Sequence, residues 1–168
     1  AHPDFYNIIL DTVELRNQYC PDAKISVLSN STFANKEKVR AALMLVDNNI
    51  LKIDTVDPEY IQRVDRPTQQ SYDISKIIDN LKLFNGHVIV QSMFLKGKTV
   101  DGIDVDNTCE KYVKPWLDAI LSIQPQEVMI YTIDRETPDQ KLEKATHAEL
   151  DAIRDRVIAA GIPCTASY

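Results

Sequence analysis

Residues 50–54 read Ile50-Leu51-Lys52-Ile53-Asp54, and Asp57-Pro58-Glu59 follows after two further residues. The first stretch has the length and apolar content of a buried strand, and the second begins a short helix, because aspartate caps helices and proline fits their first turn. Alternate residues of a strand face opposite sides, so Lys52 and Asp54 share the face opposite the apolar residues. Burying a lone lysine is costly. Lys52 and Asp54 therefore lie at a wet sheet edge, satisfy each other, or meet a ligand.

The same alternation of helix and strand extends to both sides of this stretch. Apolar residues recur at helical spacing in some segments and form short continuous runs in others, with turn residues between them. The expected helices cover residues 5–19, 36–46, 57–66, 73–84, 109–123 and 146–160, and the expected strands cover 25–29, 50–54, 88–94, 127–132 and 162–167. Residues 96–107 and 134–139 are expected loops, and Asp4 is the expected N-cap of the first helix.

Strict alternation of helices and strands predicts an α/β protein with a parallel sheet of four to five strands. Right-handed crossovers would cover at least the outer face of that sheet with helices. A chain of 168 residues with 44% hydrophobic residues is long enough for one sizeable core, so residues 1–168 are expected to form a single domain. Open doubly wound sheets and β/α barrels both satisfy the pattern, and in both the functional groups collect at the carboxyl ends of the strands.

Composition excludes several classes of function. The formal net charge is −6, with 19 basic and 25 acidic side chains interspersed, so no general nucleic-acid surface is expected. No apolar run approaches the length of a membrane span and no secretory leader is present, which makes the cytoplasm the expected location. The chain opens without methionine and is already in a helical pattern by Phe5, as if cut rather than begun.

The cysteines and histidines predict no metal site in this chain. Cys20, Cys109 and Cys164 are odd in number and far apart, without the close spacing of zinc or cluster ligands, which favours reduced structural thiols. The histidines have no carboxylate or thiolate at ligand spacing.

Polar residues end each of the first four expected strands. They are Ser29 and Asn30, Lys52 and Asp54, Gln91 and Ser92, and Tyr131 and Thr132, with Asp134 and Arg135 just beyond the last pair. Taken singly, Gln91 also fits a satisfied core amide, and Asp134-Arg135 also fits an exposed loop pair. Together, polar groups that converge from four strand ends predict a cavity for a ligand with several hydrogen-bonding groups.

Five segments that include these strand ends resemble the radical S-adenosylmethionine (SAM) superfamily in their order and spacing. The segments are residues 28–32, 51–54, 65–67, 91–97 and 131–135. The chain is most similar to iron–sulfur oxidoreductases of the wyosine-synthesis and glycyl-radical-activating-enzyme type. The resemblance implies an incomplete parallel (β/α) barrel, a partial TIM barrel, of which residues 1–168 are the C-terminal portion.

The resemblance also implies what lies outside this chain. In the family, the first part of the barrel carries three closely spaced cysteines that hold a [4Fe–4S] cluster, and a Gly-Glu-Pro segment that receives the methionine amino group of SAM. Residues 1–5 look like the residues that follow Gly-Glu-Pro-Thr. None of Cys20, Cys109 and Cys164 matches the cluster motif, so this fragment alone is expected to bind neither cluster nor SAM and to contain no catalytic residue.

Roles in the parent enzyme follow from the resemblance position by position. The implied SAM-binding residues are Ser29, Asn30, Lys52, Asp54, Gln91, Met93 and Tyr131, and the implied substrate contacts are Asp134 and Arg135. Among these, Lys52 and Asp54 are expected to reach the carboxylate and the ribose hydroxyls of SAM. Tyr131 is expected near the adenine or the substrate.

The implied activity belongs to the parent enzyme. A reduced cluster gives one electron to SAM, which breaks into methionine and a 5′-deoxyadenosyl radical that abstracts hydrogen from a substrate. The implied partners are an electron donor such as flavodoxin or ferredoxin and a protein, tRNA or small-molecule substrate. Activation of a glycyl-radical enzyme and modification of a tRNA base both fit.

Two readings from other classes compete with the enzyme. One is a self-contained α/β domain that binds a small metabolite without redox chemistry. The other is an interaction domain whose open edge at residues 25–29 pairs with another chain, because unpaired strand edges associate readily.

Overall fold

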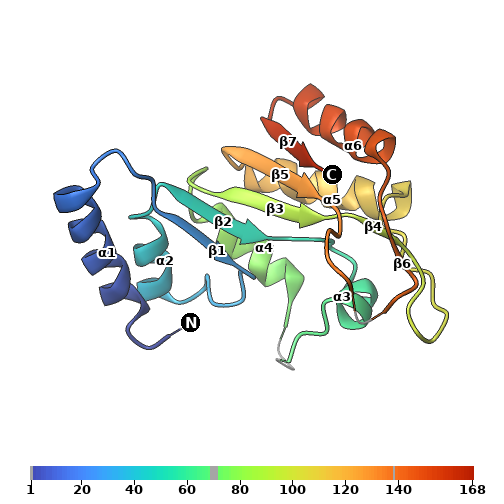
Figure 1. Cartoon of the computed structure of the whole chain (residues 1–168), viewed down its shortest axis with the longest axis horizontal. Coiled ribbons are helices and arrows are strands. Elements are labelled where there is room, and N and C mark those ends of the chain that lie inside the picture. The colour runs from blue at the N-terminus through green and yellow to red at the C-terminus, as the bar shows by residue number, and fades with distance from the viewer. Residues whose placement is uncertain (1, 69–71, 138) are drawn as a thin grey trace.

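The computed structural model describes residues 2–68, 72–137 and 139–168, and helices and strands alternate along them (Figure 1). The helices are α1 Phe5–Tyr19, α2 Glu37–Leu43, α3 Pro58–Val64, α4 Ile74–Lys82, α5 Glu110–Ile123 and α6 His147–Ala159. The strands are β1 Ser26–Ser29, β2 Asn48–Lys52, β3 Ile89–Met93, β4 Leu95–Gly97, β5 Glu127–Tyr131, β6 Leu142–Lys144 and β7 Cys164–Ser167.

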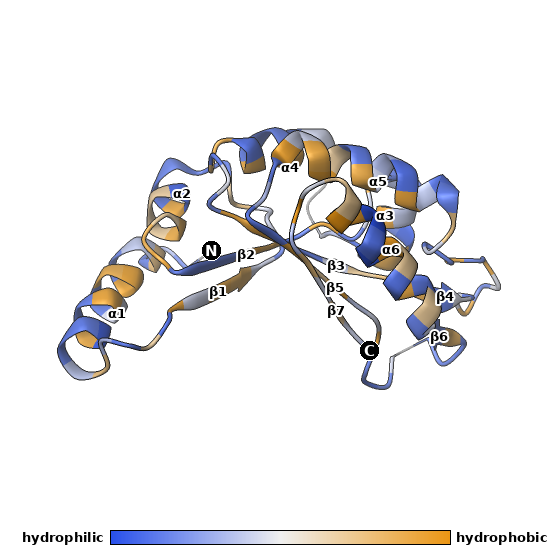
Figure 2. Cartoon of the chain, turned by 90° about the horizontal axis from the view of Figure 1, so that it is seen from above, coloured by the Kyte–Doolittle hydropathy of each residue, from blue (hydrophilic) through white to orange (hydrophobic). Residues whose placement is uncertain are grey.

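The main sheet has five parallel strands in the order β1-β2-β3-β5-β7. This order follows the chain without reversal, so successive right-handed crossovers return on the same side of the sheet. A doubly wound sheet would contain a reversal of strand order. Figure 2 shows the sheet bent into an arch, with helices along its outer side and none on its inner side. The predicted α/β class and incomplete parallel (β/α) barrel are therefore confirmed.

The core lies between the sheet and the helices on its outer side. Leu51 and Ile53 are 0% and 2% exposed and belong to the main apolar cluster, together with Trp116 of α5. On the opposite face Leu28 is 64% exposed. Lys52 shares that inner face, as the alternation in residues 50–54 predicts. Ile50 and Ile89 lie on the same face and are 8% and 2% exposed, so this face is exposed at Leu28 and buried at these two residues.

Three helices start with side-chain caps, and one predicted cap is absent. The side chains of Asp57 and Asp73 accept hydrogen bonds from the first turns of α3 and α4, and Thr146 and Glu149 form a reciprocal capping box on α6. The predicted cap at Asp4 is wrong, because its side chain makes no capping hydrogen bond and its backbone is at φ −92°, ψ 16°, outside the extended region that caps adopt.

The sequence does not predict a second, two-stranded sheet: β4 overlaps the start of the loop expected at residues 96–107, and β6 follows the loop expected at residues 134–139. β4 and β6 pair antiparallel, with Leu95 opposite Lys144 and Gly97 opposite Leu142. Three-residue strands carry no usable periodicity, and their pairing depends on distant parts of the chain. Gly97 is necessary there, because its φ is +97° and a Cβ at this position would lie 2.2 Å from the carbonyl oxygen of Lys141.

The edge of β1 has no second strand partner within the described residues. Self-association through this edge stays a prediction, which a measurement of molecular mass in solution would check. Across the described ranges, every helix is too short or too polar to cross a bilayer.

Trp116 anchors α5 against the strand ends. Its indole Nε1 donates to Ser92 Oγ at 3.0 Å and to the carbonyl oxygen of Ile53 at 3.2 Å, and its side chain is buried. Trp116→Phe removes this donor and leaves unfilled volume, so we expect the free energy of unfolding to fall by about 2–3 kcal/mol in urea titrations. Tyr19→Phe, at a residue 68% exposed, should change it by less than about 0.5 kcal/mol. Equal losses in the two variants would contradict this assignment.

Candidate functional site

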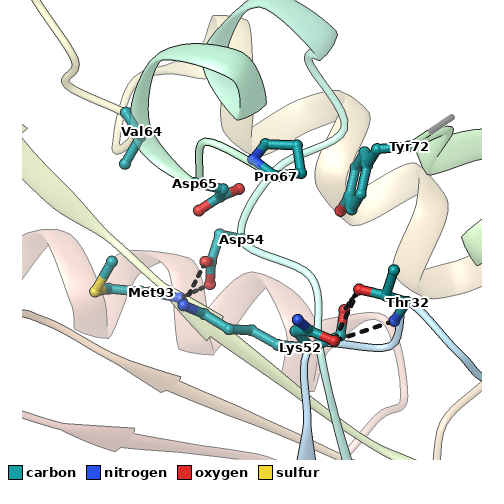
Figure 3. A pocket seen from close by; sticks show the side chains of 9 residues that line it. Thr32, Lys52, Asp54, Val64, Asp65, Pro67, Tyr72 and Met93 are labelled. Atoms are coloured by element: carbon teal, nitrogen blue, oxygen red, sulfur yellow. Dashed lines mark hydrogen bonds and ion pairs between the residues drawn. The ribbon is translucent and has the colours of Figure 1, made fainter. Parts of the chain in front are cut away.

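A hollow of about 320 Å³ opens where β1, β2 and β3 end, which is within the size range of small-molecule pockets. Side chains from the loop after β1, the end of β2, the end of β3 and the connection between α3 and α4 line it (Figure 3). They are Asn30, Thr32, Lys52, Asp54, Val64, Asp65, Pro67, Tyr72 and Met93.

An ion pair between Lys52 and Asp54 forms the floor of the hollow. Lys52 Nζ lies 2.8 Å from Asp54 Oδ2, and Asp54 Oδ1 accepts a hydrogen bond of 2.7 Å from the backbone N–H of Met93. The Asp54 side chain is only 4% exposed, whereas that of Lys52 is 33% exposed. Lys52 therefore finds its partner in Asp54, one of the alternatives that the sequence left open.

The charge of Lys52 is retained in this setting. Burial by itself lowers the pKa of Lys52, but the adjacent carboxylate of Asp54 outweighs it and raises the pKa above its usual value. An ammonium group has three donors, and the ion pair with Asp54 leaves others for a ligand.

A tight turn after β1 forms one wall. Ser31 has a left-handed backbone conformation, with φ +67°, and its hydroxyl donates to the carbonyl oxygen of Lys52 at 3.0 Å. Thr32 Oγ1 donates to Asn30 Oδ1 at 2.8 Å. The turn thus fixes Asn30 and Thr32 beside Lys52. Ser31, at 1% exposure, is a buried structural residue that the sequence analysis did not single out.

The opposite wall comes from the end of α3. Arg66 adopts φ +45° and its backbone N–H donates to the carbonyl oxygen of Ile61 at 2.9 Å, which ends the helix and turns the chain. Although Asp65 is exposed as a whole residue, its carboxyl group points toward Asp54 (Figure 3). Burial of this group and the negative charge of Asp54 raise the pKa of Asp65 to about 7.

The structure brings together four of the residues proposed for SAM: Asn30, Lys52, Asp54 and Met93 all line the hollow. Gln91 and Tyr131 lie next to them on the inner face, since Lys52 pairs with Gln91 and Met93 with Tyr131 in the strand register. Both are half-buried and outside the lining of the hollow.

Ser29 and the residues beyond β5 lie elsewhere. By strand alternation Ser29 faces the helix-covered side with Val27, and its hydroxyl accepts from the backbone N–H of Ser31 at 3.2 Å. Ser29 therefore lies outside the lining of the hollow, and its contact with SAM stays a prediction. Asp134 is 82% exposed in its side chain and pairs with Lys144 at 3.1 Å. Arg135 is exposed as well. These two residues match the alternative of an exposed loop pair.

Sequence reasoning missed Thr32, Val64, Asp65, Pro67 and Tyr72 as parts of the site. None of them lies on a strand: Val64 is the last residue of α3, and the other four belong to connections. Residues 65–67 belong to a segment that resembles the radical SAM superfamily, yet nothing in this segment indicates that the connection after α3 turns back over the end of β2.

The described residues do not fit an iron–sulfur cluster. All three cysteines are free thiols in separate parts of the fold: Cys20 follows α1, Cys109 precedes α5 and Cys164 lies on β7. No three or more His, Cys, Asp or Glu side chains gather into a possible metal site in residues 2–68, 72–137 and 139–168. Cluster ligands would have to come from outside these residues.

Comparison with known proteins gives distant relatives in sequence. No protein-family model matches the chain. A UPF0026 protein of Helicobacter pylori is 26% identical over 139 residues, which cover 80% of this chain and 42% of that protein. A UPF0026 protein of Synechocystis is 29% identical over 119 residues, covering 68% of this chain and 41% of that protein. The chain thus spans less than half the length of these relatives.

Solved structures with a similar fold include a radical SAM methyltransferase from Sphaerobacter thermophilus, with a TM-score of 0.60 at 13% identity, covering 86% of this chain and 40% of that chain. A domain of pyruvate-formate lyase-activating enzyme from Bacteroides vulgatus has a TM-score of 0.63 at 12% identity, covering 100% of this chain and 96% of that chain. SuiB of Streptococcus suis, solved with bound S-adenosylmethionine, has a TM-score of 0.66 at 12% identity, covering 100% of this chain and 37% of that chain. SuiB has also been solved with its precursor peptide SuiA. The likeness at this identity establishes the fold.

The raised pKa of Asp65 predicts how stability varies with pH. The folded chain holds the Asp65 proton more tightly than the unfolded chain, so this contribution to stability is complete below about pH 4 and is lost as pH rises to about 7. Asp65→Asn removes the effect. We expect the variant to gain about 1–2 kcal/mol relative to the parent protein between pH 5 and pH 8, well below the full linkage value because the residue is partly open to solvent.

Urea titrations at several pH values measure this difference. Asp118→Asn is the matched control, since Asp118 is 64% exposed in its side chain on α5. A stability difference between Asp65→Asn and the parent protein that stays constant over this pH range would contradict the assignment.

Proposed function

We propose that residues 1–168 are the C-terminal, SAM-binding portion of a radical SAM enzyme whose cluster-binding portion lies outside this chain. One observation carries the proposal: Asn30, Lys52, Asp54 and Met93 meet in one hollow at the carboxyl ends of consecutive parallel strands. Ligands of such sheets bind at that end of the strands. The similarity in fold to SuiB, which was solved with bound SAM, supports SAM as the ligand.

The contacts suggest how the ligand would lie. Lys52 keeps free donors for the carboxylate of SAM while it remains paired with Asp54. Asn30 and Asp54 offer acceptors for the ribose hydroxyls. SAM is longer than the hollow, and its remaining part would extend along the open inner face past Gln91 and Tyr131, which adjoin Lys52 and Met93 in the sheet.

We further propose a peptide or protein substrate, ahead of a tRNA or a small molecule. The precursor peptide bound to SuiB and the activating-enzyme neighbour support this choice, and the formal net charge of −6 disfavours a polyanionic partner. The electron donor would be a flavodoxin or ferredoxin.

The complete reading frame that encodes this chain provides the test. The protein is purified without oxygen, its cluster is reconstituted, and 5′-deoxyadenosine is measured after reduction in the presence of SAM. We expect three closely spaced cysteines upstream of residue 1 and SAM-dependent formation of 5′-deoxyadenosine. A reading frame without such cysteines, or a protein that binds a small metabolite but not SAM, would replace the proposal with the metabolite-binding domain.

Substitution of Lys52 is the most direct test of SAM binding in the hollow. We expect Lys52→Met to weaken SAM binding about tenfold in calorimetric titrations, because it removes a hydrogen bond between charged groups. Lys82→Met is the matched control, since Lys82 also pairs with an aspartate, Asp79, at 3.0 Å, but on the surface of α4. Its affinity for SAM should not change.

A second variant separates binding from stability, since Lys52→Met also leaves Asp54 without its partner. Asn30→Ala breaks no buried ion pair, and we expect it to weaken SAM binding about threefold with little change in the urea midpoint. Unchanged affinity in both variants would exclude the hollow as the SAM site.

A further inference from the structure

The charges that line the hollow do not balance. Lys52 carries the one positive charge among its lining residues, and Asp54 and Asp65 carry two carboxyl groups. Lys52 Nζ lies 2.8 Å from Asp54 Oδ2, so the charges of these two side chains balance each other. When Asp65 is ionised, the hollow has one negative charge in excess.

The groups around Asp65 leave that excess uncompensated. No ion pair to Asp65 occurs within the part of the chain that the structure describes. The neighbouring Arg66 turns its guanidinium toward Asp139, at 3.3 Å, and toward the carbonyl oxygen of Arg63. Among the described residues, the Asp65 carboxyl group therefore faces the hollow beside the carboxylate of Asp54 and without a cationic partner of its own.

The other titratable groups near the hollow keep one charge state around neutral pH. Tyr60 of α3, Tyr72 before α4 and Tyr131 of β5 are the phenols near Asp54 and Asp65, and burial raises the pKa of each, so they stay neutral. Lys52 stays charged, because its pKa is raised by the adjacent Asp54 despite burial. Among these groups, Asp65 is therefore the one whose charge changes near neutral pH.

We propose that Asp65 is the contact for a positively charged group of the ligand, so that the hollow prefers a cationic ligand to its neutral analogue and releases a proton on binding. The protonated carboxyl loses its proton to solvent, and the resulting carboxylate pairs with the ligand cation. This inference refines the proposed function, on which it rests in part. The sulfonium of SAM and a protonated amine of the substrate both supply such a positive charge.

The preference must depend on pH. If the cation binds the ionised form of Asp65, affinity follows the ionised fraction, which for a pKa of about 7 rises about tenfold or more between pH 5.5 and 7.5. Below pH 7.5 the α-amino group of an amino-acid ligand is still largely protonated, so it contributes little to this change.

The experiment compares SAM with S-adenosylhomocysteine, which lacks the positive charge on sulfur. Calorimetric titrations of the complete protein at pH 5.5 and 7.5 give the ratio of the two affinities, and two buffers of different ionisation enthalpy reveal proton release. We expect the ratio to rise by about tenfold or more with pH in the parent protein and to stay constant in Asp65→Asn. Asp65→Glu should keep the rise, and the surface control Asp118→Asn should match the parent protein.

A second pair of probes distinguishes the source of the cation. The ratio of the affinities for SAM and S-adenosylhomocysteine can stay constant with pH while n-butylammonium binds more tightly at pH 7.5 than at pH 5.5. If this change requires Asp65 and neutral butyramide does not show it, the contact belongs to a substrate amine. If the preference for the charged member of each pair depends on neither pH nor Asp65, the inference is wrong, but the proposal that the hollow binds SAM is unaffected. If SAM and its homocysteine analogue fail to bind but butylammonium shows the linkage, the proposed function is wrong and the inference survives.

Discussion

The carboxylate of Asp54 is the contact on which the site depends. It accepts the backbone N–H of Met93 from β3 and pairs with Lys52 of β2, so one buried side chain joins the ends of two neighbouring strands. A carboxylate this deeply buried requires both partners, because removing either would leave a charged or polar group without compensation. The pair therefore fixes the spacing of the strand ends and presents the remaining donors of Lys52 to the hollow.

On the helix-covered face of the sheet, neutral side chains form hydrogen bonds to the same strand ends. Ser92 and Trp116 both donate to the carbonyl oxygen of Ile53, within the apolar layer between the sheet and α5. The segment that leaves β2 is thus tied on its outer side by hydrogen bonds in the core and on its inner side by an ion pair. This two-sided attachment explains how a site at the end of a strand can be rigid while the inner face stays open.

Sequential strand order determines where that open face lies. Every crossover of the main sheet packs on the outer side, so the inner face keeps no covering helix (Figure 2). Exposed Leu28 and half-buried Gln91 and Tyr131 line it. An arch with one uncovered face suits a long ligand that begins in the hollow and continues along the strands.

Local sequence alone determined the order of the helices and of the five strands of the main sheet, the cap at Asp57, and the sharing of one face by Lys52 and Asp54, because periodicity and capping depend on nearby residues. Tertiary structure alone decided that Ser29 faces the helices, that β4 and β6 pair, and that Asp65 lies over Asp54. These features depend on how distant segments turn and meet. Such contacts leave no periodic signal in the residues that make them.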